Sequence, residues 1–291
     1  MFLGWLGLCG ALVFGLTTTI VDADSAPRDG SMPAAHADTW TGGTNSVPRV
    51  QSSGAITTLI YLPSIGKGWL SCPAPSVTYG TVAVISAPSN PPAEINADIN
   101  LAMRGYTPTV AYKGLADIAG GPPSDPNAPQ LFNLFADKRV PVFRNVYRVY
   151  DWNWTCNCRG QPISDWEVTL AGLGVSPGEP ICVPGSGYDI GHAPSGFSMM
   201  VLYATSTRLT LKYSREDNVV NGYTLHIENI SVAPDLLALY QSMNAAGRSR
   251  LPALFGGQQI GTAITTEIGV AIRDTGSFLD PRSRQDWWQG K

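Results

Sequence analysis

The sequence predicts a mainly β protein of the α+β type, in which an antiparallel sheet carries a few peripheral helices. The 31 Gly and 23 Pro among 291 residues are too many for a helical bundle. Short runs rich in Val, Ile, Thr and Tyr recur along the chain and are typical of strands. These runs do not alternate with helices in the βαβ rhythm of a parallel sheet, which favours antiparallel pairing.

The composition excludes several classes of protein. With 44% hydrophobic and 14% charged residues the chain can bury a core, which argues against wholesale disorder, a collagen-like fibre and a protein with many membrane spans. The 19 basic and 22 acidic residues nearly cancel, so no basic footprint predicts a nucleic acid or an anionic membrane as partner. The function must therefore be inferred from individual sites.

The first segment is typical of protein export. Residues 2–21 are apolar apart from a threonine cluster, and a small-residue pattern that suits signal-peptidase cleavage ends at Ala23. We interpret residues 1–23 as a signal peptide. An uncleaved membrane anchor is the alternative, because no Lys or Arg precedes the apolar run and its length approaches that of a membrane span. Both interpretations place the rest of the chain outside the cytoplasm.

Three further regions follow this segment. Residues 24–55 are rich in Ser, Thr, Pro, Gly and Asp and lack apolar periodicity, which predicts a flexible linker. We divide the remainder into a β-rich region with short helices over residues 56–175 and a β domain over residues 176–291.

Four cysteines lie beyond the apolar segment, namely Cys72, Cys156, Cys158 and Cys182. An even number in an oxidising compartment predicts two disulfides. Zinc binding is the less favoured alternative, because one residue between Cys156 and Cys158 is too short for a structural zinc site. Alternate residues of an extended segment share a face, so we expect Cys156 and Cys158 to reach Cys72 and Cys182 more easily than each other.

The region up to residue 175 contains strands and short helices. We expect strands over residues 57–62, 77–86 and 142–154 and one or two helical turns over residues 130–137. A helix is predicted to begin at Pro91 and end near Gly105. Its buried stripe would be Ile95, Ile99 and Met103, and its outward residues Glu94, Asn96 and Asn100.

Three tryptophans form a candidate platform for sugar rings. Trp152, Trp154 and Trp166 present flat apolar faces that suit the C–H faces of pyranoses, so a cell-wall glycan is a candidate partner. The competing interpretation is that these rings pack in the core or across strands, as most aromatic residues of strands do.

The second half of the chain reads as a series of strands around one helix. The expected strands are residues 166–170, 199–203, 208–213, 222–230, 258–263 and 266–273. Ser231 is the expected N-cap of the helix, and Gly247 stops it. In the last strand Ile268, Val270 and Ile272 should face the core. The tail over residues 280–288 combines cations with two indoles, and we expect it to dock on the domain rather than bind a partner.

Several short motifs occur in the order of a known family. They are GYDI at 187–190, APSG at 193–196, VLYA at 201–204, GQQIGT at 257–262, EIGVAIR at 267–273 and FLDP at 278–281. From about Gly185 to Pro281 this order resembles the lysostaphin-like zinc metalloendopeptidases, which cut peptide cross-links of bacterial cell walls. The resemblance implies an antiparallel sheet of that fold and a cell-envelope location.

The metal ligands implied by the resemblance are incomplete. Asp189 matches the family's Asp ligand, but Gly185 stands where its first His would be, and Glu267-Ile-Gly269 replaces the closing His-x-His. One carboxylate cannot provide the three protein ligands of a catalytic zinc site. The resemblance therefore implies a degenerate scaffold without catalysis, a pseudoenzyme that binds cell-wall glycan or peptide or has a structural role.

A displaced zinc site is the alternative. His226 and Glu228 share one face of an expected strand, and His192 lies close to Asp189 in sequence. Asp189, His192, His226 and Glu228 could supply ligands, with Glu267 as general base and His226 also required for catalysis. The protein would then be a divergent zinc-dependent hydrolase of peptidoglycan or peptides. The competing interpretation is that His226 and Glu228 lie solvated on an outer strand face.

Overall fold

The structure is a computed structural model, and it describes residues 70–73, 78–118, 124–191 and 196–291. These residues belong to a compact unit that spans Pro63–Lys291. The expected signal segment, the linker, the strand over 57–62 and His192 lie outside the described residues. Within the described ranges, no helix has the length and apolar character needed to cross a membrane.

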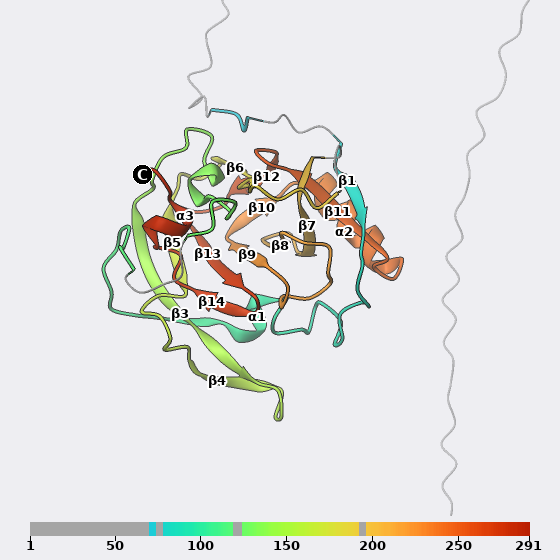
Figure 1. Ribbon diagram of the computed structural model, residues 1–291, viewed down its shortest axis with the longest axis horizontal. Helices are drawn as coiled ribbons and strands as arrows, with labels where there is room; N and C mark the ends of the chain where they lie inside the picture. Colours follow the sequence, from blue (N-terminus) through green and yellow to red (C-terminus); the bar gives the residue numbers. More distant parts are fainter. Residues whose placement is uncertain (1–69, 74–77, 119–123, 192–195) are drawn as a thin grey trace, which may run out of the picture. The chain divides into compact units, whose positions relative to one another are not determined.

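The described residues are mainly β, as the sequence predicts, and every pair of named strands is antiparallel. The strands of the large sheet are β1 (Gly80–Ala83), β2 (Tyr106–Pro108), β3 (Phe143–Asn153), β4 (Cys158–Pro162), β5 (Leu170–Gly174), β7 (Phe197–Ala204), β8 (Arg208–Lys212), β9 (Tyr223–Glu228), β11 (Arg250–Phe255), β13 (Glu267–Asp274) and β14 (Ser277–Leu279). Their order is β1-β11-β7-β8-β9-β13-β5-β3-β2, with β14 on β13 and β4 on β3 (Figure 1). A small sheet has the order β10 (Ile230–Val232), β12 (Gln259–Ala263), β6 (Pro180–Cys182).

The large sheet continues across residue 175, where the sequence was divided. Strands β3 and β5 precede that position and β13 follows it, and β13 pairs directly with β5. The long strand expected over residues 142–154 is confirmed as β3. The strand expected over 166–170 is wrong in position, because β5 begins only at Leu170. Before it, the carbonyl of Glu167 accepts a hydrogen bond from Arg148 and its carboxylate accepts one from Arg282, so side chains hold Glu167 in place.

A single residue moves the chain from one sheet to the other. The strand expected over residues 222–230 is divided into β9 and β10 at Asn229, which has a φ of 65°. Asn tolerates this left-handed conformation better than most residues. β9 pairs with β8 and β13 in the large sheet, whereas β10 pairs with β12 in the small one.

The helices are shorter or displaced relative to the prediction. The helix expected from Pro91 to Gly105 is wrong, because only α1 (Leu101–Arg104) is helical. Asn96 and Asn100 are buried rather than turned outward, and the Asn100 side chain caps α1 by accepting from the Ala102 amide and donating to the Glu94 carbonyl. Such side-chain bonds compete with a continuous helix.

The remaining helices lie at the periphery of the sheets. Residues 130–137 contain a 3₁₀ turn, η1 (Leu131–Leu134), and α3 (Arg284–Trp287) lies in the tail. The helix expected after residue 231 is confirmed as α2 (Pro234–Ala245). Its N-cap is Ala233 and not Ser231, which lies in β10.

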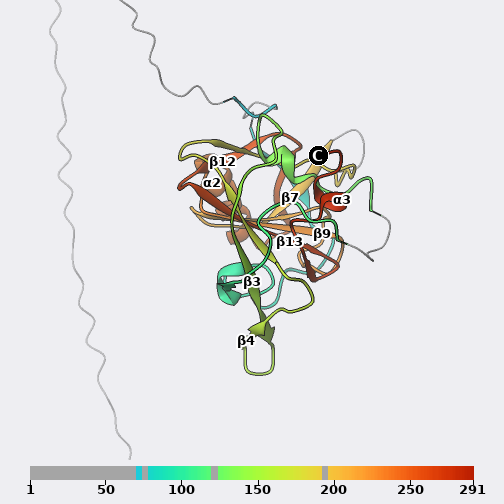
Figure 2. The same ribbon diagram turned by 90° about the vertical axis from the view of Figure 1, so that its left-hand side faces the viewer.

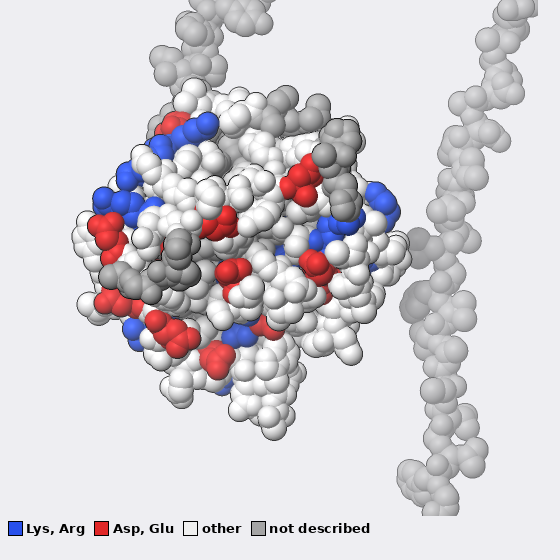
Figure 3. All heavy atoms as spheres, in the orientation of Figure 1, with Lys and Arg blue, Asp and Glu red and all other residues white. Residues whose placement is uncertain are grey.

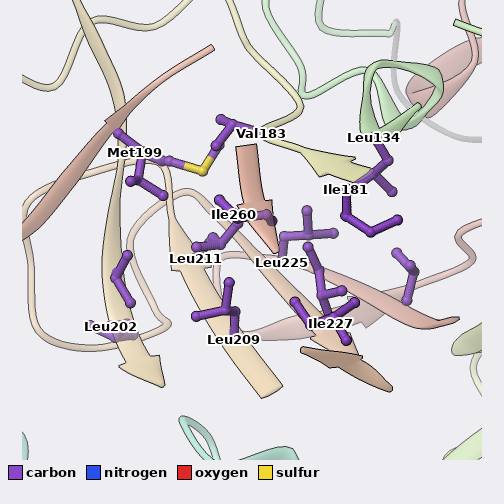
Figure 4. Packing of buried hydrophobic residues seen from close by; sticks show 14 of the residues in the cluster. Leu134, Ile181, Val183, Met199, Leu202, Leu209, Leu211, Leu225, Ile227 and Ile260 are labelled. Atoms are coloured by element: carbon purple, nitrogen blue, oxygen red, sulfur yellow. The ribbon is translucent and has the colours of Figure 1, made fainter. Parts of the chain in front are cut away.

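The main core lies between the two sheets. Figure 4 shows Leu211 of β8 and Leu225 of β9 close to Ile260 of β12, with Ile181 of β6 in the same layer. Ile268, Val270 and Ile272 are fully buried in this core, which confirms the predicted register of β13. The opposite face of β13 is also covered, because Ala271 packs in a second cluster with Leu101, Val149, Leu170 and Phe278.

All four predicted cysteines form disulfides, which are typical of an oxidising compartment outside the cytoplasm. The expected pairing is wrong: Cys72 bonds to Cys182, and Cys156 bonds to Cys158. The prediction assumed an extended segment, but Cys156 lies in the turn before β4 and Asn157 has a φ of 51°. This turn brings the Cα atoms of Cys156 and Cys158 to 5.3 Å, within the usual range for a disulfide.

Candidate functional site

The positions that the resemblance associates with metal ligands do not assemble a site among the described residues. The carboxylate of Asp189 accepts hydrogen bonds from the amide N–H groups of Gly191, at 2.8 Å, and Gly196, at 3.2 Å. A Cβ atom at Gly185 would lie 3.4 Å from Gly256 Cα, and one at Gly269 would lie 3.6 Å from Glu228 Cβ. Within the described ranges, no group of three or more His, Cys, Asp or Glu side chains is arranged to hold a metal ion.

His226 is buried rather than solvated, with only 1% of its surface exposed. Its Nδ1 lies 3.1 Å from the Thr210 hydroxyl, whose single proton is donated to the Ile99 carbonyl at 2.6 Å. Nδ1 must therefore be the donor in the His226 contact, and in the neutral ring the lone pair then lies on Nε2. Burial, together with the nearby charges of Arg273 and Arg104, holds the pKa of His226 well below its ordinary value. The same two charges disfavour a metal cation at this ring.

Glu228 and Glu267 are each bound by protein donors. Glu228 is also buried and not solvated, and it accepts from Arg208 Nε at 2.7 Å. Glu267 accepts from Asn145 Nδ2 at 2.6 Å and from the Tyr147 hydroxyl at 3.0 Å. Burial and this hydrogen bond raise the pKa of Tyr147 to about 12, so its hydroxyl stays protonated and continues to donate. Both carboxylates thus have structural partners, and His192 is outside the described residues.

The three candidate tryptophans occupy two different settings. Trp152 and Trp154 make an edge-to-face contact at 6.4 Å on the β3–β4 hairpin, where Trp152 is buried and 49% of Trp154 is exposed. Figures 1 and 2 both show this hairpin extending beyond the rest of the sheet. Trp166 makes no ring contact with either of them. It lines a pocket elsewhere on the molecule.

This pocket, which we call the aromatic pocket, has a volume of about 170 Å³. Its aromatic side chains are Trp166, Tyr223 and Trp287, and its acidic side chains are Asp125, Asp274, Asp280 and Asp286. Tyr223 begins β9 and Asp274 ends β13, and these two residues are paired across the sheet. Trp287 lies in α3, which both views show beside β13 (Figures 1 and 2).

The docked tail builds one side of the aromatic pocket, as expected for the tail's two indoles. Trp287 and Trp288 are buried, and their Nε1 atoms donate to the carbonyls of Asp280 and Pro281, each at 2.9 Å. Trp287 also packs edge-to-face on Tyr223 with ring centroids 5.6 Å apart. Arg282 ties the tail to the segment of Trp166, because it donates to Asp280 at 2.7 Å and to Glu167 at 3.1 Å.

Two carboxyl groups of the aromatic pocket have pKa values that move in opposite directions. Burial raises the pKa of Asp125, but hydrogen bonds from the Tyr188 hydroxyl, at 2.7 Å, the Asn127 amide and the Tyr223 hydroxyl outweigh it and lower the pKa below its ordinary value. Burial raises the pKa of Asp274, and the nearby charge of Asp125 adds to this effect. Asp125 is therefore easier to ionise than an ordinary aspartate, whereas Asp274 is harder to ionise.

A larger pocket of about 510 Å³ has a different character. It is lined by Arg104, Arg273 and Phe278 among others. Both guanidinium groups already donate to Asp98, at 2.7 and 2.9 Å. Because these arginines are buried and hold the chain segment before α1, we assign them a structural role.

Sequence reasoning identified Trp166 and, in the docking tail, Trp287, but it missed the other members of the aromatic pocket. Asp125 lies in a loop, Tyr223 and Asp274 lie at strand ends, and Trp287 is in the tail, so no local spacing marks them as a group. The indoles of the tail were the one available signal.

On the face shown in Figure 3, acidic side chains lie across the middle while most Lys and Arg side chains lie nearer the edges.

Comparison with known proteins gives no further assignment. No model of a protein family matches the chain, and no curated protein sequence matches it.

Proposed function

We propose that this chain is an exported, non-catalytic binding protein of the cell envelope, and that the aromatic pocket holds one sugar ring of a glycan. The observation that carries the proposal is the combination of Trp166 and Tyr223, both partly exposed, with carboxylates around one cavity. Aromatic faces pack on the C–H faces of a sugar, and carboxylates accept hydrogen bonds from its hydroxyl groups.

The size of the aromatic pocket favours part of a long ligand. Pockets that enclose a whole small molecule usually measure about 300–1,000 Å³, whereas this one measures about 170 Å³. A single ring or terminal group of a polymer suits such a volume, and the rest of the polymer would extend across the surface.

The finer fold assignment, a degenerate lysostaphin-like scaffold, is part of the same proposal. It is supported by the antiparallel order of the sheet and by Gly185 and Gly269, which lack the side chains that the family's ligand positions require. Export is supported by the two disulfides.

The test compares two tryptophan variants by calorimetric titration with an N-acetylglucosamine hexamer and by retention on insoluble cell-wall material. Trp166→Ala should abolish or strongly weaken binding. Trp154→Ala removes an exposed indole outside the aromatic pocket and is the matched control. Binding that depends on Trp154 and not on Trp166 would move the site to the hairpin, and a wild-type protein that binds neither ligand would refute the proposal.

A further inference from the structure

We propose that the aromatic pocket selects a sugar that carries a protonated amine, such as a glucosamine unit, over its N-acetylated form. This inference rests on the proposed function, because it assumes that the aromatic pocket holds a sugar ring. It is carried by the cavity's aromatic walls together with carboxylates that have no ion-pair partner in the described part of the chain.

The lining of the aromatic pocket contains four aspartates and no Lys, Arg or His. Asp280 is paired with Arg282 at 2.7 Å, and both side chains are buried, so this charge is neutralised within the protein. Asp125, Asp274 and Asp286 have no ion-pair partner within the described part of the chain. The aromatic pocket therefore carries excess negative charge.

Neutral groups satisfy the hydrogen bonding of these carboxylates without cancelling their charge. Asp125 accepts from the hydroxyl groups of Tyr188 and Tyr223, and Asp286 accepts from the Ser283 hydroxyl at 2.5 Å. The charge of Lys212 acts on Asp274, but Lys212 does not line the cavity, and its ammonium group donates to backbone carbonyls including that of Gly222, at 3.2 Å. An ammonium group on the ligand would supply the missing positive charge.

The aromatic walls favour the same chemistry. A cation close to the face of Trp or Tyr is attracted by the negative charge of the ring, and this attraction strengthens where water is excluded. Trp166 and Tyr223 stand beside the carboxylates in the same cavity. An N-acetyl group is neutral and adds volume to a ligand that must fit about 170 Å³, so it would lose both advantages.

The experiment compares a glucosamine hexamer with an N-acetylglucosamine hexamer, titrated into the full chain at pH 6, where the amine is protonated. We expect the glucosamine hexamer to bind on the order of tenfold more tightly. Asp274→Asn should remove this preference. Asp235→Asn makes the same change of net charge on the exposed side of α2, outside the cavity, and should retain it. Asp286→Asn serves as a second variant if Asp274→Asn does not fold.

Each outcome is decisive. Equal binding of both hexamers, or tighter binding of the acetylated one, overturns the amine preference while the proposed function stands. Failure of both hexamers to bind overturns both proposals. An equal loss in Asp235→Asn and Asp274→Asn would show that only net charge matters, which also overturns the inference.

Discussion

The two disulfides of this protein differ in almost every structural respect. Cys72–Cys182 is buried and joins residues 110 positions apart, and it fastens the segment before β1 to β6 of the small sheet. Cys156–Cys158 is exposed at the tip of the β3–β4 hairpin and joins residues two positions apart. There the strands already meet, because Asn153 pairs with Cys158.

The two bonds constrain the unfolded chain to very different degrees. Closing a loop of about 110 residues restricts the unfolded state by about 5 kcal/mol, whereas closing one of three residues restricts it by about 1.5 kcal/mol. The first bond therefore stabilises the whole fold, and the second mainly fixes the shape of a turn that strand pairing has already formed.

The largest effect should follow removal of the buried bond. A Cys72→Ser, Cys182→Ser double variant should lose about 5 kcal/mol of unfolding free energy, measured by chemical denaturation, because loop closure is lost and serine hydroxyls replace sulfur in a buried site. A loss below about 1 kcal/mol would show that the buried bond does not stabilise the whole fold.

A change of pH should have an intermediate effect, because it acts on the buried side chain of His226 and not on the hairpin. The pKa of His226 is depressed in the folded state. Below its unfolded value of about 6.5, the unfolded chain therefore binds a proton that the folded chain does not. Stability should consequently fall as the pH falls from about 6.5 to 5, by about 2 kcal/mol. Denaturation curves across this range test it, and His226→Gln should flatten the dependence if the fold tolerates the change.

The smallest effect should come from the hairpin. A Cys156→Ser, Cys158→Ser variant should lose at most about 1.5 kcal/mol. Under native conditions, a mild reductant should release two thiols from the exposed pair before the buried pair reacts. Peptide mapping after alkylation distinguishes the pairs. Reduction of Cys72–Cys182 before Cys156–Cys158 would contradict this prediction.

Regular patterns in the sequence predicted the regular parts of the fold. The alternation of Ile268, Val270 and Ile272 fixed the inner face of β13, and the aromatic and β-branched run fixed β3. The prediction missed β11, where Pro252 interrupts an apolar segment and pairs with Thr81 of β1. It also missed the side-chain bonds of Asn100, which cap α1 so that the helix begins only at Leu101 and not at Pro91.

The candidate site was less predictable than the fold. Of the aromatic pocket, only Trp166 and, in the docking tail, Trp287 were singled out, because its other members come from a loop, two strand ends and the tail. His226 and Glu228 were expected on a solvated face or at a metal, yet the second cluster covers that face of the sheet. A local sequence pattern shows which residues of a strand share a face. It does not show whether a distant segment of the chain packs over that face.

The passage of the chain through Asn229 also governs how the protein opens. Only one residue separates β9 from β10. This connection is too short for the small sheet to separate from the large sheet while the large sheet stays intact. Amide protons of the two strands should therefore exchange with solvent as one cooperative unit. A protease would rarely encounter a partly unfolded form, because the apolar faces between the sheets become accessible only when both sheets separate together.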